Sequence, residues 1–205
     1  KPGPVIAHWT LDDPVSEDNV EVKDSGPNQL HGELKHTKGV AFGVKSVKAM
    51  RSNGLEFSDG HAAWIALPLN ELLDLKPPFT IAAWIKPAKA TTIEILNRKW
   101  DSTPGGYRLR SYGKHLAFSF GNDTSEVSVD TDPGTVEEGH WAHVAVSYNG
   151  KQIKLFVNGQ LCTTKDTTIQ PTGSFQGKPI PITIGNYTVT CYTMRFVDAQ
   201  APAGV

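Results

Sequence analysis

Short apolar stretches of strand length, separated by turn residues, run along most of the chain. Residues 5–11, 63–67 and 79–86 are three such stretches, and each is followed by an Asp or a Pro. Residues 107–112 alternate, and a period of two resumes after the turn at Gly113. This period places apolar side chains on one face of a strand, so these segments predict antiparallel strands rather than helices.

Two Asn-Gly pairs give the strongest turn signals in the chain. Asn149-Gly150 separates the predicted strands 141–148 and 152–157, and Asn158-Gly159 leads into a further strand at 160–162. Asn-Gly favours the two-residue turns of β-hairpins, so both pairs predict neighbouring antiparallel strands. Further strands are expected at 55–57, 92–96 and 182–185, and a single helical turn at 70–75.

The order of these elements predicts the fold class. About ten short strands occur without strand–helix–strand alternation, which favours an all-β, two-sheet antiparallel jelly-roll sandwich. The Pro- and Gly-containing segment 170–181 is interpreted as a loop, because strand signals resume directly after it. With no internal repeat, residues 1–205 are expected to form a single domain with a sizeable core.

The composition argues against nucleic-acid binding and membrane insertion. Lys plus Arg is 20 and Asp plus Glu is 21, a balance that argues against binding to nucleic-acid phosphates. No apolar run approaches the roughly 20 residues of a membrane-spanning helix, so no membrane insertion is expected. Residues 1–4 are polar and turn-like, without the apolar region of a signal peptide.

A set of segments occurs in a characteristic order along residues 5–190. They are 7–13, 22–28 with His31-Gly32, 55–60, 79–86, 106–109, 141–146, 154–159 and 184–186. Together they resemble the laminin-G-like, concanavalin A-like jelly roll. The resemblance implies a secreted or cell-surface protein that binds an oligosaccharide or polysaccharide, often beside a catalytic domain. The expected closing strand is altered, since only Val197-Asp198 of residues 194–200 fits its pattern.

Residues around the 97–101 segment have the composition of a sugar site. Recognition of a sugar requires flat aromatic faces for C–H groups and planar polar groups for hydroxyls. Trp100 lies in a loop rather than on an alternating apolar face, although it could also be a lid over the sandwich end. Tyr187 and Tyr192 form a second candidate rim. The predicted carbohydrate-binding residues are Asn97, Arg98, Trp100, Asp101, Tyr107, Arg110, Tyr187 and Tyr192.

Calcium is the candidate cofactor, because many domains of the resembling family hold this ion. The loop from Asp24 to Asn28 offers carboxylate and amide oxygens, which calcium prefers. Asp12 and Asp198 could approach this loop if the first and last strands pair. The alternative is that Asp24 only forms a local turn with its own backbone.

Cys162 and Cys191 are the only cysteines, and two interpretations compete. A secreted protein would join them in a disulfide, whereas two inert buried thiols would suit a reducing environment. The expected extracellular setting favours the disulfide.

Catalytic signatures are weak. Sandwich glucanases carry a strand of the Glu-x-Asp-x-Glu type, whose acids all face the sugar. Residues 126–130 have acids at both ends but none in the middle, so they do not form this strand. No Gly-x-Ser-x-Gly motif of a serine nucleophile occurs either. Arg108, Arg110, Tyr112 and His143 could imitate a polysaccharide lyase. We therefore expect a non-catalytic lectin or carbohydrate-binding module. A sandwich-fold hydrolase or lyase and an adhesion or protein-interaction domain are the alternatives.

Tryptophans within strand patterns are expected in the core. They are Trp9, Trp84 and Trp141. His143 has the opposite parity to Val144, so its side chain is expected on the other face of its strand.

Overall fold

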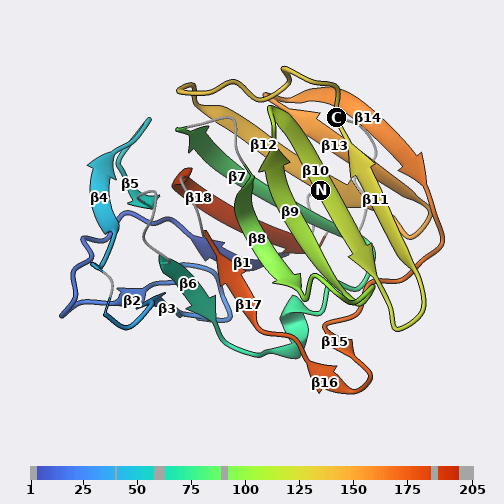
Figure 1. Cartoon of the computed structure of the whole chain (residues 1–205), viewed down its shortest axis with the longest axis horizontal. Helices are drawn as coiled ribbons and strands as arrows, with labels where there is room; N and C mark the ends of the chain where they lie inside the picture. Colours follow the sequence, from blue (N-terminus) through green and yellow to red (C-terminus); the bar gives the residue numbers. More distant parts are fainter. Residues whose placement is uncertain (1–3, 40, 58–62, 89–91, 186–188, 199–205) are drawn as a thin grey trace.

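The computed structural model describes residues 4–39, 41–57, 63–88 and 92–185, and the backbone of residues 189–198. Two eight-stranded sheets and one two-stranded sheet make up the described part, and every strand pairing is antiparallel. One large sheet lies in front of the other (Figure 1). The predicted all-β sandwich is thus confirmed.

The rear sheet in Figure 1 is called the β7 sheet. Its spatial order is β14 (Gln160–Asp166), β13 (Gln152–Val157), β12 (Ala142–Tyr148), β7 (Phe79–Pro87), β18 (Val189–Asp198), β5 (Asn53–Phe57) and β4 (Val44–Lys48), with β1 (Val5–Trp9) also on β18.

The front sheet is called the β9 sheet. Its order is β11 (Glu126–Asp130), β10 (His115–Gly121), β9 (Gly106–Tyr112), β8 (Ile93–Lys99), β17 (Ile182–Ile184), β6 (Ala63–Leu67), β3 (Gly32–His36) and β2 (Glu21–Val22). A separate small sheet joins β15 (Ser174–Phe175) to β16 (Lys178–Pro179).

The core fills the space between the two large sheets. Along β7 the buried and half-buried residues alternate strictly, so one face of this strand is buried and the other is only half-buried. Phe79 and Tyr148 from the β7 sheet meet Phe118 and Phe120 from the β9 sheet, with ring centroids 5.0 to 6.2 Å apart across the sandwich. Burying each such side chain stabilises the fold by about 1.5–3 kcal/mol, so this aromatic cluster fastens the sheets together.

The sequence did not predict every strand near the edges of the two large sheets. The sequence predicts neither β3 nor β4, whereas both strands form in the structure. The closing strand β18 pairs with β7, β5 and β1 although its residues depart from the family pattern. Its pairing uses backbone groups, which every residue except Pro supplies equally.

The tryptophan prediction was only partly right. Trp9 is fully buried, and its Nε1 donates to the carbonyl oxygen of Leu30 at 2.8 Å. Trp84 and Trp141 are half-buried instead. Trp84 alternates with buried Ala83 and Ile85, so its side chain lies on the outer face of the β7 sheet. His143 is its cross-strand partner there, which confirms the predicted parity.

The structure gives no support to the predicted disulfide, which stays a prediction. Cys162 lies on β14 and has a free thiol, whereas Cys191 lies on β18. Three strands, β13, β12 and β7, separate β14 from β18. Four strand spacings amount to about 19 Å, far beyond the roughly 7 Å that a disulfide spans between Cα atoms.

The predicted helical turn is a 3₁₀ turn, η1 (Glu71–Leu73). The side chain of Asn70 caps it by accepting from the Leu72 N–H. No helix in the described part of the chain is long and apolar enough to cross a membrane.

Candidate functional site

A polar surface covers the outer face of the β9 sheet at β8 and β9. Glu94 pairs with Arg110 across these strands, and Asn97 pairs with Arg108. A β-bulge between Glu94 and Leu96 places Glu94 and Asn97 on the same face although they are three residues apart. With Asp101 of the following turn, these five residues are called the polar face.

Arg108 occupies the centre of the polar face. Its Nη1 donates to Asp101 Oδ1 at 2.7 Å and lies 3.6 Å from Glu94 Oε1. The side chains of Arg108 and Glu94 are only 12% and 9% exposed, whereas that of Asp101 is 90% exposed. One guanidinium therefore joins a buried carboxylate of the sheet to an exposed carboxylate of the turn.

Two buried polar atoms of the polar face have no hydrogen-bond partner among the described residues. They are Glu94 Oε2 and Arg108 Nε. A buried polar atom without a partner costs about 1–3 kcal/mol, so such atoms are rare and require an explanation. Each of these atoms exposes less than 1 Å² to solvent, so a ligand with a donor and an acceptor would satisfy them only by displacing the side chains that cover them.

Burial also affects the ionisation of Glu94. Desolvation raises the pKa of its carboxyl above the usual range, and Asp101 adds to this increase. The positive charges of Arg108 and Arg110 act in the opposite direction but do not offset it. Burial therefore disfavours the ionised form of the Glu94 carboxyl.

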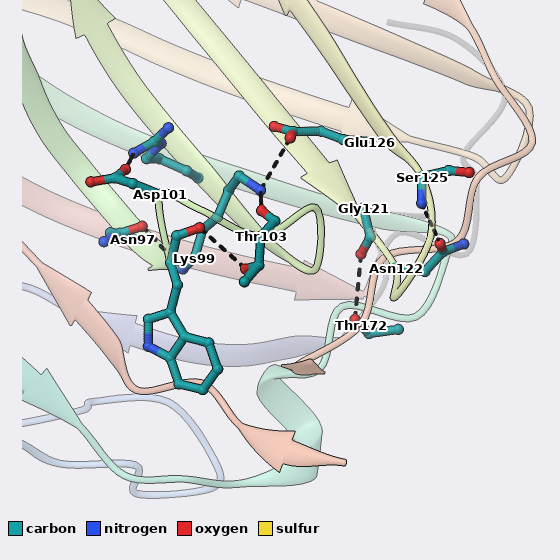
Figure 2. A network of polar contacts seen from close by, with 11 residues as sticks. Asn97, Lys99, Asp101, Thr103, Gly121, Asn122, Ser125, Glu126 and Thr172 are labelled. Atoms are coloured by element: carbon teal, nitrogen blue, oxygen red, sulfur yellow. Dashed lines mark hydrogen bonds and ion pairs between the residues drawn. The ribbon is translucent and has the colours of Figure 1, made fainter. Parts of the chain in front are cut away.

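The turn between β8 and β9 forms one end of the polar face. Lys99 Nζ lies 3.2 Å from Glu126 Oε2 and donates to the Thr103 carbonyl, while the Thr103 N–H donates to the Trp100 carbonyl at 3.2 Å. Figure 2 shows Lys99 directed at Thr103 and Glu126. These contacts hold the turn closed, and the Trp100 side chain in it remains 37% exposed.

Tyr112 marks the other end of the polar face. It is 55% exposed, and the Arg110 guanidinium lies 5.6 Å from its ring centroid, within cation–π range. Gly106 and Tyr112 bound β9, so about 20 Å of strand separates the two aromatic ends. This length suits an extended ligand rather than a single small ring.

Four predicted sugar-binding residues lie on or beside the polar face: Asn97, Trp100, Asp101 and Arg110. Arg98 and Tyr107 do not, because they point into the sandwich and are 3% and 0% exposed. Burial raises the pKa of the Tyr107 hydroxyl far above its usual value. Their assignment as ligand contacts is therefore corrected to a structural one. Tyr187 and the side chain of Tyr192 lie outside the described residues.

The predicted calcium ligands are engaged in protein contacts. Asp24 Oδ1 accepts from the N–H groups of His8 and Gly26, and its Oδ2 accepts from that of Leu30, at 2.6 to 2.8 Å. The bond from Gly26, two residues after Asp24, is the local turn of the alternative interpretation. The Asn28 amide instead donates to the carbonyl of Ile6, 22 residues earlier in the chain.

Asp12 has a different contact, because its Oδ1 accepts from Ser52 Oγ. No three His, Cys, Asp or Glu side chains gather as a metal site within the described residues, and the Asp198 side chain is not among these. Calcium therefore stays a prediction.

Sequence reasoning missed Glu94 and did not assign Arg108 and Tyr112 to sugar binding. The Tyr107 to Tyr112 alternation already places Arg108, Arg110 and Tyr112 on one face of β9. That alternation was a usable signal. Glu94 carried no such signal, since the bulge changes the face on which it lies.

Solved structures of similar fold are binding domains of larger proteins. The binding domain of Paraclostridial Mosquitocidal Protein 1 matches 95% of this chain with a TM-score of 0.68 and 15% identity, over 49% of its own length. A structure entitled "Cell entry of botulinum neurotoxin type C is dependent upon interaction with two ganglioside molecules" matches 95% of this chain (TM-score 0.64, 15% identity, 48% of its length).

A third structure is the binding domain of botulinum neurotoxin DC in complex with SialylT. It matches 95% of this chain with a TM-score of 0.62 and 14% identity, over 48% of its own length. The chain therefore spans about half the length of these structures. At such low identity, these likenesses show the fold alone.

Family comparison is more specific than the structural likeness. No curated protein sequence matches this chain. The Laminin_G_3 family model, described as the concanavalin A-like lectin/glucanases superfamily, matches residues 59–196. This match covers more than half of the sequence and includes the β8–β9 hairpin with its polar face. The chain belongs to the concanavalin A-like lectin/glucanase superfamily.

Proposed function

We propose that this chain is a non-catalytic carbohydrate-binding domain that holds an oligosaccharide or polysaccharide on the polar face of the β9 sheet. The observation that carries the proposal is the pair of unpartnered, buried atoms, Glu94 Oε2 and Arg108 Nε. They lie on the same outer surface as Asn97 and Arg110, on a hairpin that carries exposed Trp100 in its turn and exposed Tyr112 at the end of β9.

Sugar hydroxyls suit this pair of atoms better than other common ligands. A hydroxyl both donates and accepts, so neighbouring hydroxyls can donate to the Glu94 carboxylate and accept from Arg108 Nε. A phosphate would face the carboxylates of Glu94 and Asp101, and an apolar ligand would leave both buried atoms unsatisfied. Trp100 and Tyr112 supply the aromatic faces on which C–H groups of a sugar ring pack.

The titles of two similar structures name gangliosides and SialylT as what those proteins bind. This agrees with a glycan as the ligand class for the present chain. A glycan ligand in turn suits a secreted or cell-surface protein, standing beside or within a larger polysaccharide-acting protein. We propose this setting as part of the same function.

Calcium is an optional component of the proposal. An ion in the Asp24 loop would need oxygen ligands beyond the occupied Asp24 carboxylate, and the Asp198 carboxylate is the remaining candidate of the predicted set. A chelator tests this: if calcium supports the site, EGTA weakens glycan binding and added calcium restores it. Equal affinity with and without EGTA would contradict a calcium requirement.

Glycan-array screening followed by calorimetry tests the binding function. We expect Arg108→Gln to weaken the best ligand by about tenfold to a hundredfold, the loss of one charge-assisted hydrogen bond. Trp100→Ala should weaken it while leaving the melting temperature nearly unchanged. Arg51→Gln is the matched control, because Arg51 is an exposed arginine in the turn before β5.

Two outcomes would overturn this assignment. If no glycan binds, the domain is not a lectin. If Arg108→Gln and Arg51→Gln bind the ligand equally well, the polar face is not its site. A large loss of thermal stability in Trp100→Ala would identify Trp100 as a packing residue.

A sandwich-fold hydrolase is the second candidate, because two carboxylates of the polar face are close together. Glu94 and Asp101 both contact Arg108 Nη1, so their nearest oxygens are at most about 6.3 Å apart, near the separations used by glycosidases. The guanidinium, however, occupies the space between the acids where the scissile bond would lie. Turnover of a polysaccharide that Glu94→Gln abolishes would establish hydrolysis instead of binding alone.

Adhesion to a protein has less support. This function predicts one broad, exposed apolar patch. The exposed large apolar side chains of the described residues are instead distributed over β14, β9, the β8–β9 turn, the β4–β5 turn and the η1 region. They are Met50, Leu69, Leu72, Trp100, Tyr112 and Leu161.

A further inference from the structure

A pocket opens on the β9 sheet at β2, β3 and β6, near the sheet edge that β2 forms. Its volume is about 520 Å³, and small-molecule sites have volumes of about 300–1,000 Å³. It is called the β3 pocket. It is lined by Val20, Glu21, His31, Gly32, Glu33, Ala66, Leu67 and Pro68.

The strand register places this pocket on the outer face of the β9 sheet. Glu33 pairs with Glu21 on one side and with Ala66 on the other. Ala66 alternates with buried residues of β6, so all three side chains lie on the outer face. His31 and Pro68 directly adjoin β3 and β6 and have the same parity as Glu33 and Ala66. The pocket is therefore on the same face as the polar groups of β8 and β9.

One row of paired residues connects the β3 pocket to the polar face. Six neighbouring strands, from β9 to β2, contribute one residue each: Arg108, Asn97, Thr183, Ala66, Glu33 and Glu21. Five strand spacings amount to about 24 Å. Between the two sites the row contains only the short side chains of Thr183 and Ala66, so no long side chain of the row separates them.

Trp100 lies at the same end of the sheet as the β3 pocket. The strands β8 and β6 run in the same direction, because both pair antiparallel with β17 (Figure 1). Trp100 follows the end of β8, just as Pro68 follows the end of β6. The exposed indole therefore flanks the row at the strand ends where the pocket opens.

The polar groups of the β3 pocket suit sugar hydroxyls. His31 Nδ1 accepts from the Asp24 N–H at 3.0 Å, so the neutral ring carries its proton on Nε2 and offers a donor. Glu33 Oε1 lies 2.5 Å from Lys35 Nζ. The exposed Glu21 carboxylate has no ion-pair partner among the described residues. Two carboxylates accept from hydroxyls and repel a third, which favours a neutral sugar ring over an acidic one.

We infer that the β3 pocket is a second subsite for the ligand of the polar face, and that this ligand is a neutral oligosaccharide or polysaccharide that crosses the strands from β9 to β3. The inference rests on the proposed function, because it extends the glycan of the polar face. A chain that reaches both sites gains contacts that a short glycan cannot make, so affinity increases with chain length.

Calorimetry with neutral glycans of two lengths tests the inference. The probes are cellohexaose, mannohexaose and xylohexaose, each compared with its disaccharide. We expect at least one hexaose to bind the wild type about tenfold or more tightly than its disaccharide does. Ala66→Lys fills the pocket with a long side chain, so it should reduce the hexaose affinity to that of the disaccharide and leave the disaccharide affinity unchanged. Ala145→Lys, at a half-buried outward position of the β7 sheet, is the matched control.

A milder variant tests the pocket without adding bulk. Glu21→Ala removes one acceptor and should weaken hexaose binding by about threefold to tenfold, the effect of one hydrogen bond. Glu17→Ala is its control, because Glu17 is an exposed acid in the turn before β2. Neither variant should change disaccharide binding.

Arg108→Gln separates this inference from the proposed function. It should weaken the disaccharide and the hexaose alike, since both use the polar face. The inference alone is overturned if hexaose and disaccharide bind equally well, if Ala66→Lys and Glu21→Ala match their controls, or if hexagalacturonate binds and no neutral hexaose does. If neither neutral nor acidic glycans bind at all, the proposed function fails with it.

Discussion

Arg98 and Tyr107 donate hydrogen bonds to the same acceptor, the main-chain carbonyl oxygen of Leu73. The donor–acceptor distances are 2.9 Å for Arg98 Nη1 and 2.8 Å for the Tyr107 hydroxyl. Arg98 also lies 2.6 Å from Asp74 Oδ1. These contacts join the β8–β9 hairpin to the η1 turn from inside the sandwich, and they fix the strands whose outer face carries the polar groups.

Substitutions at this junction should change stability and leave ligand affinity intact. Tyr107→Phe removes one of two donors to a shared acceptor, so we expect a loss of about 1 kcal/mol in the free energy of unfolding. Arg98→Met leaves Asp74 and the Ile180 carbonyl without their donor, while the Leu73 carbonyl keeps Tyr107. It should cost about 3 kcal/mol, the low end for a broken buried pair, because Asp74 is one-third exposed. Urea denaturation measures both values.

The contradicting result for this junction is specific. Arg98 and Tyr107 would return to the list of ligand contacts if either variant lost glycan affinity at unchanged stability.

The hairpin also depends on Gly106, whose φ is +91°. A Cβ there would lie 2.0 Å from the Arg98 carbonyl oxygen, so only glycine fits this close approach.

The fold could be predicted from the sequence because its strands alternate regularly. The β7 and β13 patterns, and the Asn-Gly turn before β13, specify the pairing of central strands. The site was less predictable. Arg98 and Trp100 are two residues apart in a polar segment, but β8 continues to Lys99, so Arg98 points inward while Trp100 lies in the turn.

Glu94 shows the limit of periodicity at this site. The bulge at residue 95 shifts the register of β8, and both Ile95 and Leu96 are buried. A strict period of two would place Glu94 and Asn97 on opposite faces. A bulge depends on how two strands pair rather than on the residues of one strand, which is why the sequence alone did not predict it.

Glu94→Gln should stabilise the protein at neutral pH and weaken glycan binding. Because the pKa of Glu94 is raised on folding, the folded state binds this proton more tightly than the unfolded state. The free energy of unfolding therefore falls as pH rises from the unfolded pKa, about 4.3, through the folded one. Glutamine cannot ionise, so the variant avoids this loss.

Urea denaturation at several pH values measures the effect of Glu94→Gln. The stability advantage of the variant should be larger at pH 7 than near pH 4 and should shrink as pH falls toward about 4. Asp130→Asn is the control, because Asp130 is an exposed acid at the end of β11. A variant less stable than the wild type at pH 7 would mean that the Arg108 contact outweighs the desolvation of Glu94.

Asp24→Asn should destabilise the N-terminal region whether or not calcium binds. Asparagine keeps one acceptor oxygen, but its NH₂ group would face an N–H donor, that of Leu30 or those of His8 and Gly26. We expect a loss of about 1–3 kcal/mol, the cost of an unsatisfied buried donor. Denaturation in EGTA measures this loss without metal, and an unchanged stability there would contradict the structural role of Asp24.

Thiol chemistry tests the separation of the two cysteines. Because β14 and β18 are four strand spacings apart, both residues should be thiols in the monomer. After denaturation without a reductant, a maleimide should add two labels to the intact mass, and dithiothreitol should leave the melting temperature unchanged. In the native protein Cys162 should react, since it is half-buried at the edge strand β14. Zero labels without reductant and two after reduction would demonstrate the disulfide, and would require β18 to leave its position between β7 and β5.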